Sequence, residues 1–186
     1  MSNLVQRDQN VVWHPYAPPS ASPIFAVDRA EGVRLTLDDG RELIDGMSSW
    51  WSAIHGYRHP HIEAAMSDQL TRMPHVMFGG LTHEPAIRLC ERLVDLTPEG
   101  LTRVFLSDSR SVAAEIALKM ALQVWHSPGR PEKRRLLTNR GGNHGETLGA
   151  LAVREPVTGG HGLFAGSLTK HLLAARPDCR FGAPPS

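Results

Sequence analysis

Serine residues gather where a predicted strand meets a predicted helix, a place where proteins often bind phosphate. The stretch VFLSDSRSVAAEIALKM places Ser107, Ser109 and Ser111 at the start of a helix that we expect from about Ser111 to Trp125. Backbone N–H groups at a helix N-terminus lack intrahelical acceptors and lie at the positive end of the helix dipole, so they can bind an anion. Plain capping by Ser109 or Ser111 explains the same residues, and the spacing alone favours capping.

A second stretch whose residues could carry chemistry, TNRGGNHGET, follows a predicted strand at 134–138. Its glycines permit a tight backbone path, and Asn143, His144 and Gly145 come directly after them. Ligands of open α/β sheets bind beyond the carboxyl ends of the strands, so we expect this loop and the serine turn to face the same crevice. His144 would then pack against a flat heterocycle or act as a hydrogen-bonding spacer. A turn with a solvated histidine is the alternative.

A third stretch, DGMSSWWSAIHGYRHP, contains Trp50 and Trp51, two of the four tryptophans in the chain. Indole rings line apolar ligand pockets and offer an N–H as a polar contact. A cluster in the core or at a subunit interface explains the pair equally well. Trp13 and Tyr16 in the segment WHPY present the same choice.

The elements that must position these residues follow from hydrophobic periodicity and turn signals. The first 20 residues suggest an irregular arm, and three strand-like runs follow at 24–27, 33–36 and 42–45. The turn Asp38-Asp39-Gly40 predicts a hairpin, and therefore a small antiparallel sheet. Helical spacing begins at Pro60 and again near Thr82.

The second half of the chain predicts strand, helix and strand in succession, at 103–106, 111–125 and 134–138, with apolar structure at 149–153 in the same layer. This order predicts a βαβ unit and a mostly parallel sheet that needs further strands beside it. From Arg176 the tail lacks periodicity.

Bulk composition excludes several classes of function. The net charge is +1, with 20 basic against 19 acidic residues, so nothing favours nucleic acid as a partner. No run of 18 apolar residues predicts a membrane span, and the polar N-terminus predicts no secretory signal. Two cysteines are too few for a disulfide scaffold, which suits the cytoplasm. The histidines lack the spacing of helical zinc ligands, so we expect no metal site, and motifs of hydrolases, P-loops and Rossmann folds are missing.

Several stretches, taken in order, resemble one family. They are WHPY at 13–16, DGMSSWWSAIHGYRHP at 45–60, HVMFGGLTHEPA at 75–86, SDSRSVAAEIALKMALQVW at 107–125 and RGGNHGET at 140–147. Together they resemble the adenosylmethionine–8-amino-7-oxononanoate (diaminopelargonic acid synthase) branch of the class-III aminotransferases, which depend on pyridoxal 5'-phosphate (PLP). The match is nearly continuous from Trp13 to about Lys170.

The resemblance implies an α/β fold, the N-terminal part of a fold-type-I PLP-dependent transferase. It would comprise an arm and small-domain strands at 1–59, a partial large PLP-binding domain at 60–175 and an irregular tail at 176–186. It also implies a homodimer that moves the amino group of S-adenosylmethionine to 8-amino-7-oxononanoate, giving 7,8-diaminononanoate.

Carried over by position, the resemblance assigns roles to single residues. Tyr16 and Trp50 would contact the keto-acid substrate, with Trp51 beside them in the pocket wall. Ser111 would bind the cofactor phosphate, and His144 and Gly145 would lie next to the pyridine ring.

Three departures from the family pattern fall on the site. Arg110 stands beside Ser111 where the family has glycine, and a positive φ there would strain the backbone. Its side chain would either add a favourable charge for the cofactor phosphate or occupy the space of that phosphate. Asn143 replaces a tyrosine whose ring helps to hold cofactor and substrate. The family's Schiff-base lysine comes from later sequence, and Lys119, Lys133 and Lys170 do not match its motif.

The missing lysine motif predicts a chain that cannot transaminate by itself, the product of a truncated or frame-shifted gene. The alternative function is a non-catalytic remnant that only associates with a partner subunit.

Overall fold

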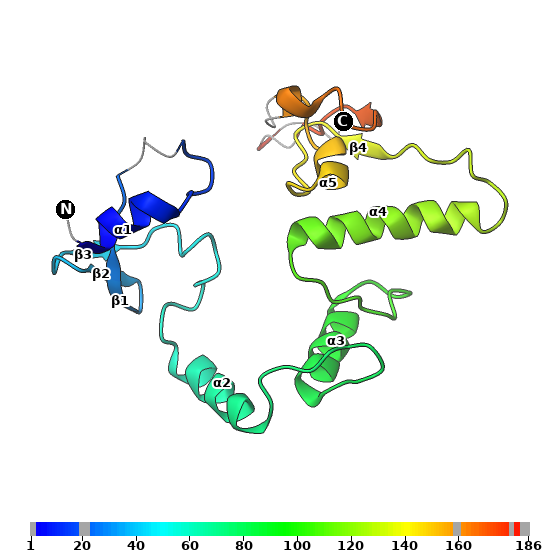
Figure 1. Cartoon of the computed structure of the whole chain (residues 1–186). Helices are drawn as coiled ribbons and strands as arrows, with labels where there is room; N and C mark the ends of the chain where they lie inside the picture. The colour runs from blue at the N-terminus through cyan, green and yellow to red at the C-terminus, as the bar shows by residue number, and fades with distance from the viewer. Residues whose placement is uncertain (1–2, 19–22, 158–160, 179–180, 183–186) are drawn as a thin grey trace. The chain divides into compact units, whose positions relative to one another are not determined.

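The computed structural model describes residues 3–18, 23–157, 161–178 and 181–182 (Figure 1). The chain divides into two compact units, Met1–Ala86 and Ile87–Ser186, and each is described by itself. The domain boundaries expected from the family resemblance, at 59 and 175, stay a prediction.

A three-stranded antiparallel sheet organises the first unit. Its strands are β1 (Val27–Glu31), β2 (Arg34–Leu37) and β3 (Glu42–Ile44), in the order β1-β2-β3. The hairpin turn contains Gly40 with a φ of 87°, a left-handed conformation that glycine adopts without strain. The predicted small sheet and its hairpin are thus confirmed, with strand bounds shifted by up to a few residues. Ala26, Leu37 and Ala86 are the buried apolar residues among those described in this unit.

Two helices flank this sheet in sequence. Helix α1 (Asn3–Val11) corrects the expectation of an irregular arm over residues 1–20. It is short and has only three apolar residues, so periodicity gave no signal, yet it contains neither glycine nor proline to break a helix. Helix α2 (Pro60–Arg72) begins as predicted, with proline in its first turn, where no intrahelical N–H bond is lost.

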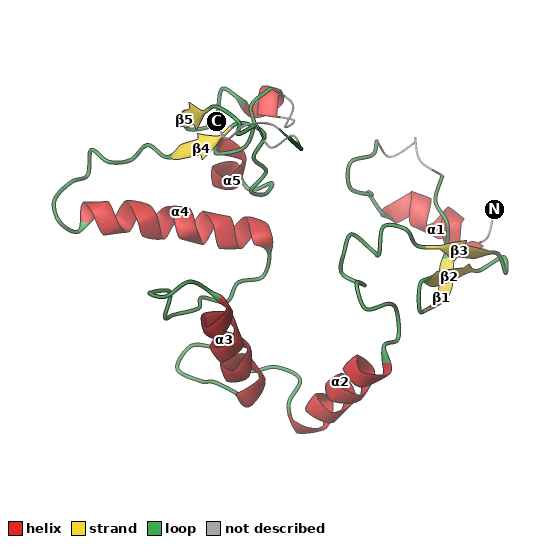
Figure 2. Ribbon diagram, turned by 180° about the vertical axis from the view of Figure 1, so that it is seen from behind, coloured by secondary structure: helices red, strands yellow, loops and turns green. Residues whose placement is uncertain are grey.

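The second unit combines helices with a parallel strand pair. After α3 (Glu84–Leu96) come α4 (Arg110–His126), β4 (Leu137–Asn139), α5 (Leu148–Ala152), the 3₁₀ helix η1 (His161–Phe164) and β5 (Leu172–Ala174). β4 and β5 pair in parallel, with Leu137 opposite Leu172. Helix α4 lies beside α5 (Figure 2). The buried apolar side chains described here are Ala150, Leu151, Val153 and Leu168.

The predicted strand at 103–106 is wrong. The segment is irregular, and Phe105 is 63% exposed. A strand needs a neighbouring strand to accept and donate its backbone hydrogen bonds, and none of the described strands pairs with this segment. The parallel pairing itself is confirmed, but it joins β4 to β5 through α5 and η1 rather than 103–106 to 134–138.

Two further segments differ from expectation. The apolar run at 149–153 is helical in α5, because short apolar runs do not distinguish strand from helix and LGALA is rich in good helix formers. β5 was not predicted. Residues 176–178 and 181–182 are irregular as expected, and the rest of the predicted tail lies outside the described residues. No described helix is both long and apolar enough to cross a bilayer.

A buried carboxylate closes the turn that follows β4. Glu155 is 9% exposed, the one buried charged residue among those described. It accepts hydrogen bonds from the N–H groups of Gly141 at 2.9 Å and Val157 at 3.2 Å, and it pairs with Arg140 at 3.3 Å. These N–H groups, and then the arginine charge, hold the pKa of Glu155 below its ordinary value against the opposing effect of burial.

We expect Gly56→Ala to destabilise the chain more than Gly40→Ala. Both glycines have positive φ, 80° and 87°, so each alanine costs about 1 kcal/mol in backbone strain. Only at Gly56 would the new Cβ meet backbone, the carbonyl oxygen of Gly32 at 2.9 Å. Urea unfolding of both variants measures the difference, and equal losses would contradict the steric argument.

We also expect Glu155 to make stability depend on acid. Because the pKa of Glu155 is lowered in the folded chain, its ionised form adds to the free energy of unfolding above the ordinary carboxyl pKa. That contribution is lost from about pH 5 downward, as the pH falls through the folded-state pKa. Glu155→Gln should therefore unfold at lower urea than the unchanged chain at pH 7, with a gap that narrows on acidification. The exposed Glu99→Gln serves as the control. A gap that stays constant with pH would rule out this role.

Candidate functional site

Ser109 caps the N-terminus of α4. Its backbone is extended, with φ −155° and ψ 164°, and its hydroxyl accepts a hydrogen bond from the N–H of Val112 at 3.1 Å. The carbonyl of Ser109 accepts the N–H of Ala113 at 2.8 Å, the first regular turn of the helix. The capping interpretation is therefore confirmed for Ser109, and it leaves Ser111 free for another contact.

Ser111 holds the loop that follows β4. The N–H of Glu146 donates to the Ser111 hydroxyl at 3.0 Å, and the Thr147 hydroxyl lies 3.5 Å from the Ser111 carbonyl. Gly145 between these segments is buried, with a φ of 137°. A Cβ at Gly145 would lie 2.5 Å from the Ser111 hydroxyl oxygen and 2.7 Å from its Cα, so only glycine fits. The serine turn and the glycine loop thus meet.

The side chains of Asn143 and His144 form hydrogen bonds that fix this loop. The Asn143 side-chain oxygen accepts the N–H of Gly145 at 3.2 Å. His144 Nε2 lies 3.3 Å from the Thr138 hydroxyl, which donates its one proton to the Val153 carbonyl at 2.9 Å. The bond between His144 and Thr138 therefore requires the histidine to carry its proton on Nε2. Both side chains are exposed, so the loop presents them outward.

Arg110 is the first residue of α4, and its side chain is exposed. Its backbone is helical, and the non-glycine residues with positive φ in the described chain do not include it. The strain expected for a residue other than glycine at this position therefore does not arise. The guanidinium stands at the same helix end as the Ser111 hydroxyl.

Glu115 ties α4 to α5 one turn further on, a contact that the sequence did not reveal. Its carboxylate accepts the N–H of Gly149 at 2.9 Å. Beside this tie lies a half-open hollow of about 370 Å³. Its apolar lining includes Leu118, Leu122 and Leu148, and its polar lining includes Lys119 and His171. Burial, and then the charge of Arg135, lower the pKa of His171.

The predicted aromatic residues meet in the first unit. The rings of Tyr16 and Trp50 are 5.7 Å apart at 82°, the edge-to-face arrangement that aromatic quadrupoles favour. Trp50 is 62% exposed and Trp51 72% exposed. Neither indole is buried in a core, which removes one of the two structural alternatives for this pair. Trp13 donates its indole N–H to the Ala17 carbonyl at 2.9 Å, within the same arm as Tyr16.

The two indoles sit on a left-handed turn. Four consecutive residues, Ser48 to Trp51, have φ values of 48°, 45°, 55° and 70°. Residues with a Cβ lose roughly 1–2 kcal/mol each in this conformation. Neighbouring bonds must therefore stabilise the turn, and two of them run within it, from Trp51 N to Met47 O at 3.2 Å and from Ala53 N to Ser48 O at 3.0 Å.

Asp45 supplies further bonds to this turn. Its carboxylate accepts the N–H of Met47 at 3.0 Å, the N–H of Ser49 at 2.8 Å and the hydroxyl of Tyr57 at 2.5 Å. The Tyr57 bond, and then the backbone N–H groups, hold the pKa of Asp45 below its ordinary value. Asp45 and the N–H of Met47 form an Asx turn, and the Asp-Gly pair at 45–46 is its signal in the sequence.

The three lysines lie away from the Ser111 loop. Lys119 lies in α4 eight residues after Ser111, about 12 Å away along the helix axis, and it lines the hollow beside Glu115. Lys133 places its ammonium 3.6 Å from the centroid of the Trp125 ring. Lys170 lines a second hollow of about 340 Å³ just before β5. Among the described residues, no three histidine, cysteine or carboxylate side chains cluster as metal ligands.

Comparison with known proteins shows the family to which the chain belongs. The family profile of class-III aminotransferases matches residues 16–183. The adenosylmethionine-8-amino-7-oxononanoate aminotransferase of Corynebacterium glutamicum is 48% identical over 182 residues, which cover 98% of this chain and 43% of that relative. The chain therefore spans less than half of the length of this relative.

Solved structures agree in fold. The Methanocaldococcus jannaschii adenosylmethionine-8-amino-7-oxononanoate aminotransferase superposes with a TM-score of 0.85 and 32% identity, over 94% of this chain and 40% of that one. A PLP-bound amine transaminase from an uncultivated Pseudomonas species gives 0.77 and 32%, over 90% and 38%. The chain has part of the fold-type-I architecture and belongs to the class-III aminotransferase family, as a homologue of the adenosylmethionine-8-amino-7-oxononanoate aminotransferases.

Proposed function

We propose that this chain forms the N-terminal part of the active site of a PLP-dependent aminotransferase that acts on S-adenosylmethionine and 8-amino-7-oxononanoate, the compounds for which its relatives are named. The observation that carries the proposal is the meeting of Ser111, at the start of α4, with the glycine loop after β4. This is where an open α/β fold binds an anionic cofactor.

The residues at this helix end fit a phosphate group. The Ser111 hydroxyl accepts a bond from Glu146, so its own proton remains available for an anionic oxygen. In the described part of the chain, the N–H groups of Arg110 and Ser111 precede the first helical bond and have no acceptor. Gly145 keeps the approach clear of a Cβ, and the Arg110 guanidinium adds a positive charge. We assign the phosphate to these groups.

When bound, PLP supplies an aldehyde that accepts an amino group and a ring that draws electrons from the bond being broken. We place His144 beside that ring, where its Nε2–H bond to Thr138 fixes the imidazole orientation. Asn143 replaces the family's tyrosine, and its side chain holds Gly145 instead of offering an aromatic face. We assign the keto-acid substrate to Tyr16 and Trp50, with Trp51 beside them in the wall.

None of the three lysines of this chain is placed for the covalent step. Transamination needs an amine that forms a Schiff base with the cofactor aldehyde and then moves a proton. Lys119 lines a separate hollow, Lys133 lies over an indole, and Lys170 precedes β5. These 186 residues therefore bind PLP without a covalent bond, and they turn over substrate only with a lysine from further polypeptide.

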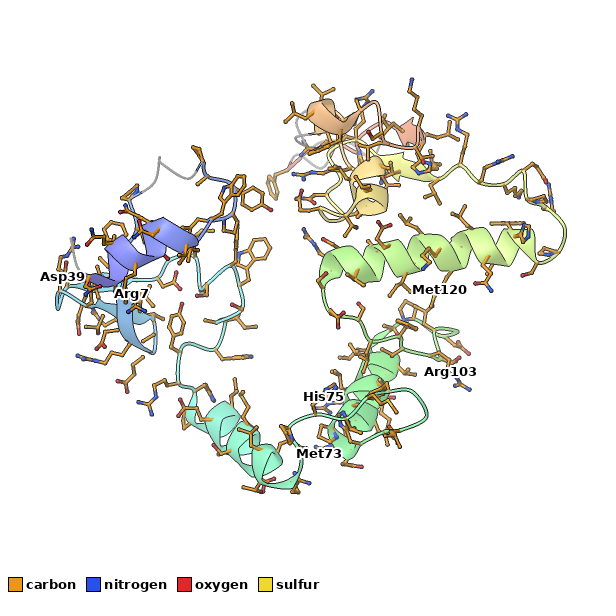
Figure 3. The ribbon with its side chains drawn as sticks, viewed as in Figure 1. Arg7, Asp39, Met73, His75, Arg103 and Met120 are labelled. Atoms are coloured by element: carbon orange, nitrogen blue, oxygen red, sulfur yellow. The ribbon has the colours of Figure 1, made fainter. Side chains whose placement is uncertain are left out.

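We further propose that the protein works as a homodimer. Helix α4 carries exposed apolar residues at helical spacing, Ala113, Ala117, Met120 and Val124, which the helical period places opposite Ser111; Figure 3 labels Met120. Met120 is 45% and Val124 64% exposed. Exposed contiguous apolar surface favours association. The family resemblance implies that the partner is a second copy of the same protein.

Gly145→Ala should weaken PLP binding about tenfold or more. The added Cβ meets Ser111 and φ is positive, so the loop must leave the helix end, at a cost of about 1–3 kcal/mol. Equilibrium dialysis against PLP measures the affinity. Gly166→Ala, in open space and without a positive φ, should bind like the unchanged chain. Equal binding by both variants would remove the phosphate assignment.

Borohydride reduction after addition of PLP tests the lysine argument. We expect little stable adduct by mass measurement, no amino transfer, and the same PLP affinity after Lys119, Lys133 and Lys170 are all replaced by arginine. Activity should return when the chain is co-expressed with the part of the Corynebacterium glutamicum relative that it does not cover. A stoichiometric adduct on one of the three lysines, with turnover by the chain alone, would refute the proposal.

A further inference from the structure

The left-handed turn at Ser48–Trp51 is held by backbone bonds within the segment and by the Asp45 carboxylate that precedes it. One N–H of the turn, that of Ser49 at 2.8 Å, and one before it, that of Met47 at 3.0 Å, donate to the Asp45 carboxylate. An acceptor at this point satisfies donors that a strained turn would otherwise leave to water. Removing it frees the backbone to return to negative φ, where residues with a Cβ are more stable.

Tyr57 completes the cluster from the far side of the turn. Its hydroxyl donates its single proton to Asp45 at 2.5 Å, so the 2.5 Å contact with Ser49 requires the serine hydroxyl to donate to Tyr57. Both hydrogen bonds thus point in one direction, from Ser49 through Tyr57 to the carboxylate. Ser49 is bound twice, through its N–H and through its hydroxyl.

The cluster is anchored to the sheet rather than to the turn alone. The N–H of Asp45 donates to the Val33 carbonyl at 2.9 Å, directly after β3. Tyr57 pairs with Gly32 through two backbone bonds, at 2.7 and 3.0 Å. Two fixed points of the first unit therefore hold the turn that carries both indoles. The β2–β3 pairing itself uses backbone bonds between other residues.

We propose that Asp45, acting through Tyr57 and Ser49, is a positioning residue that sets the orientation of Trp50 and Trp51. The assignment of these indoles to a keto-acid substrate rests on the proposed function. The positioning role does not, because it concerns only the geometry of this unit. The Trp50 indole held in this way contacts the ring of Tyr16 edge-on.

Asp45→Ala in the full chain tests the proposal, with Asp39→Ala as the matched control. Asp39 also accepts a backbone and a side-chain bond, both from Arg41, but in the hairpin turn and without contact to the indoles. A background with Trp13→Phe and Trp125→Phe leaves Trp50 and Trp51 as the reporters. Near-UV circular dichroism and iodide quenching then follow the two indoles, and far-UV circular dichroism follows the backbone.

We expect Asp45→Ala to lose much of the near-UV indole signal and to change iodide quenching, while Asp39→Ala retains both. Tyr57→Phe, which keeps the ring but removes one donor, should shift the signals in the same direction by less. Asp45→Asn keeps an acceptor oxygen and should restore part of them. Unchanged indole signals in Asp45→Ala with native far-UV spectra would overturn the proposal. If that variant unfolds, Tyr57→Phe decides in the same way.

Titration with 8-amino-7-oxononanoate separates this inference from the proposed function. Quenching of the indoles in the unaltered chain reports binding, and Asp45→Ala should bind about tenfold more weakly. No binding by the unaltered chain counts against the substrate assignment alone, because the circular dichroism comparison still decides the positioning role. Equal affinity of Asp45→Ala and the unaltered chain, with altered indole circular dichroism in the variant, would overturn the assignment of the substrate to the indoles and leave the positioning role standing.

Discussion

The close approach of Gly145 to Ser111 is the constraint on which the candidate cofactor site depends. A loop 34 residues along the chain from Ser111 comes so near the helix start that a single methyl group has no room. This contact aligns the Glu146 N–H with the Ser111 hydroxyl and leaves that hydroxyl free to donate. Glu115 and Gly149 repeat the same connection one turn further on. Two such ties fix the end of α4 against the segment that follows β4.

The first unit obtains its order in a different way. Few of its described side chains are buried, so apolar packing contributes little to the geometry around Trp50. Hydrogen bonds to one carboxylate replace it, and the ionised form of Asp45 is the form that accepts them all. The indoles are consequently exposed yet fixed in backbone conformation. An aromatic surface that must meet a substrate needs both properties, because burial would remove it from the ligand.

Local signals explain what the sequence predicted well. The hairpin at Asp38–Gly40, the start of α2 at Pro60 and most of α4 depend on neighbours within a few residues. The strand predicted at 103–106 failed because strand formation depends on a partner far away in sequence, and the described chain offers none. Helix α1 was missed because it is short and mostly polar. Ser111, Gly145 and Trp50 became candidates through residue type and family resemblance, and their roles stay predictions. Glu115 and Glu155 bond to partners that no spacing rule connects to them.

Arg110 and Asn143, which depart from the family pattern, fit the backbone geometry of the candidate site. Arg110 has helical backbone, so the place of the family's glycine accepts a side chain without strain. Asn143 loses an aromatic ring but gains a bond to the N–H of Gly145, the residue that cannot change. Both substitutions therefore preserve the loop against α4 and alter only what the loop presents outward. The contact of the loop with the start of α4 therefore depends on Ser111 and Gly145, and the side chains of Arg110 and Asn143 do not disturb it.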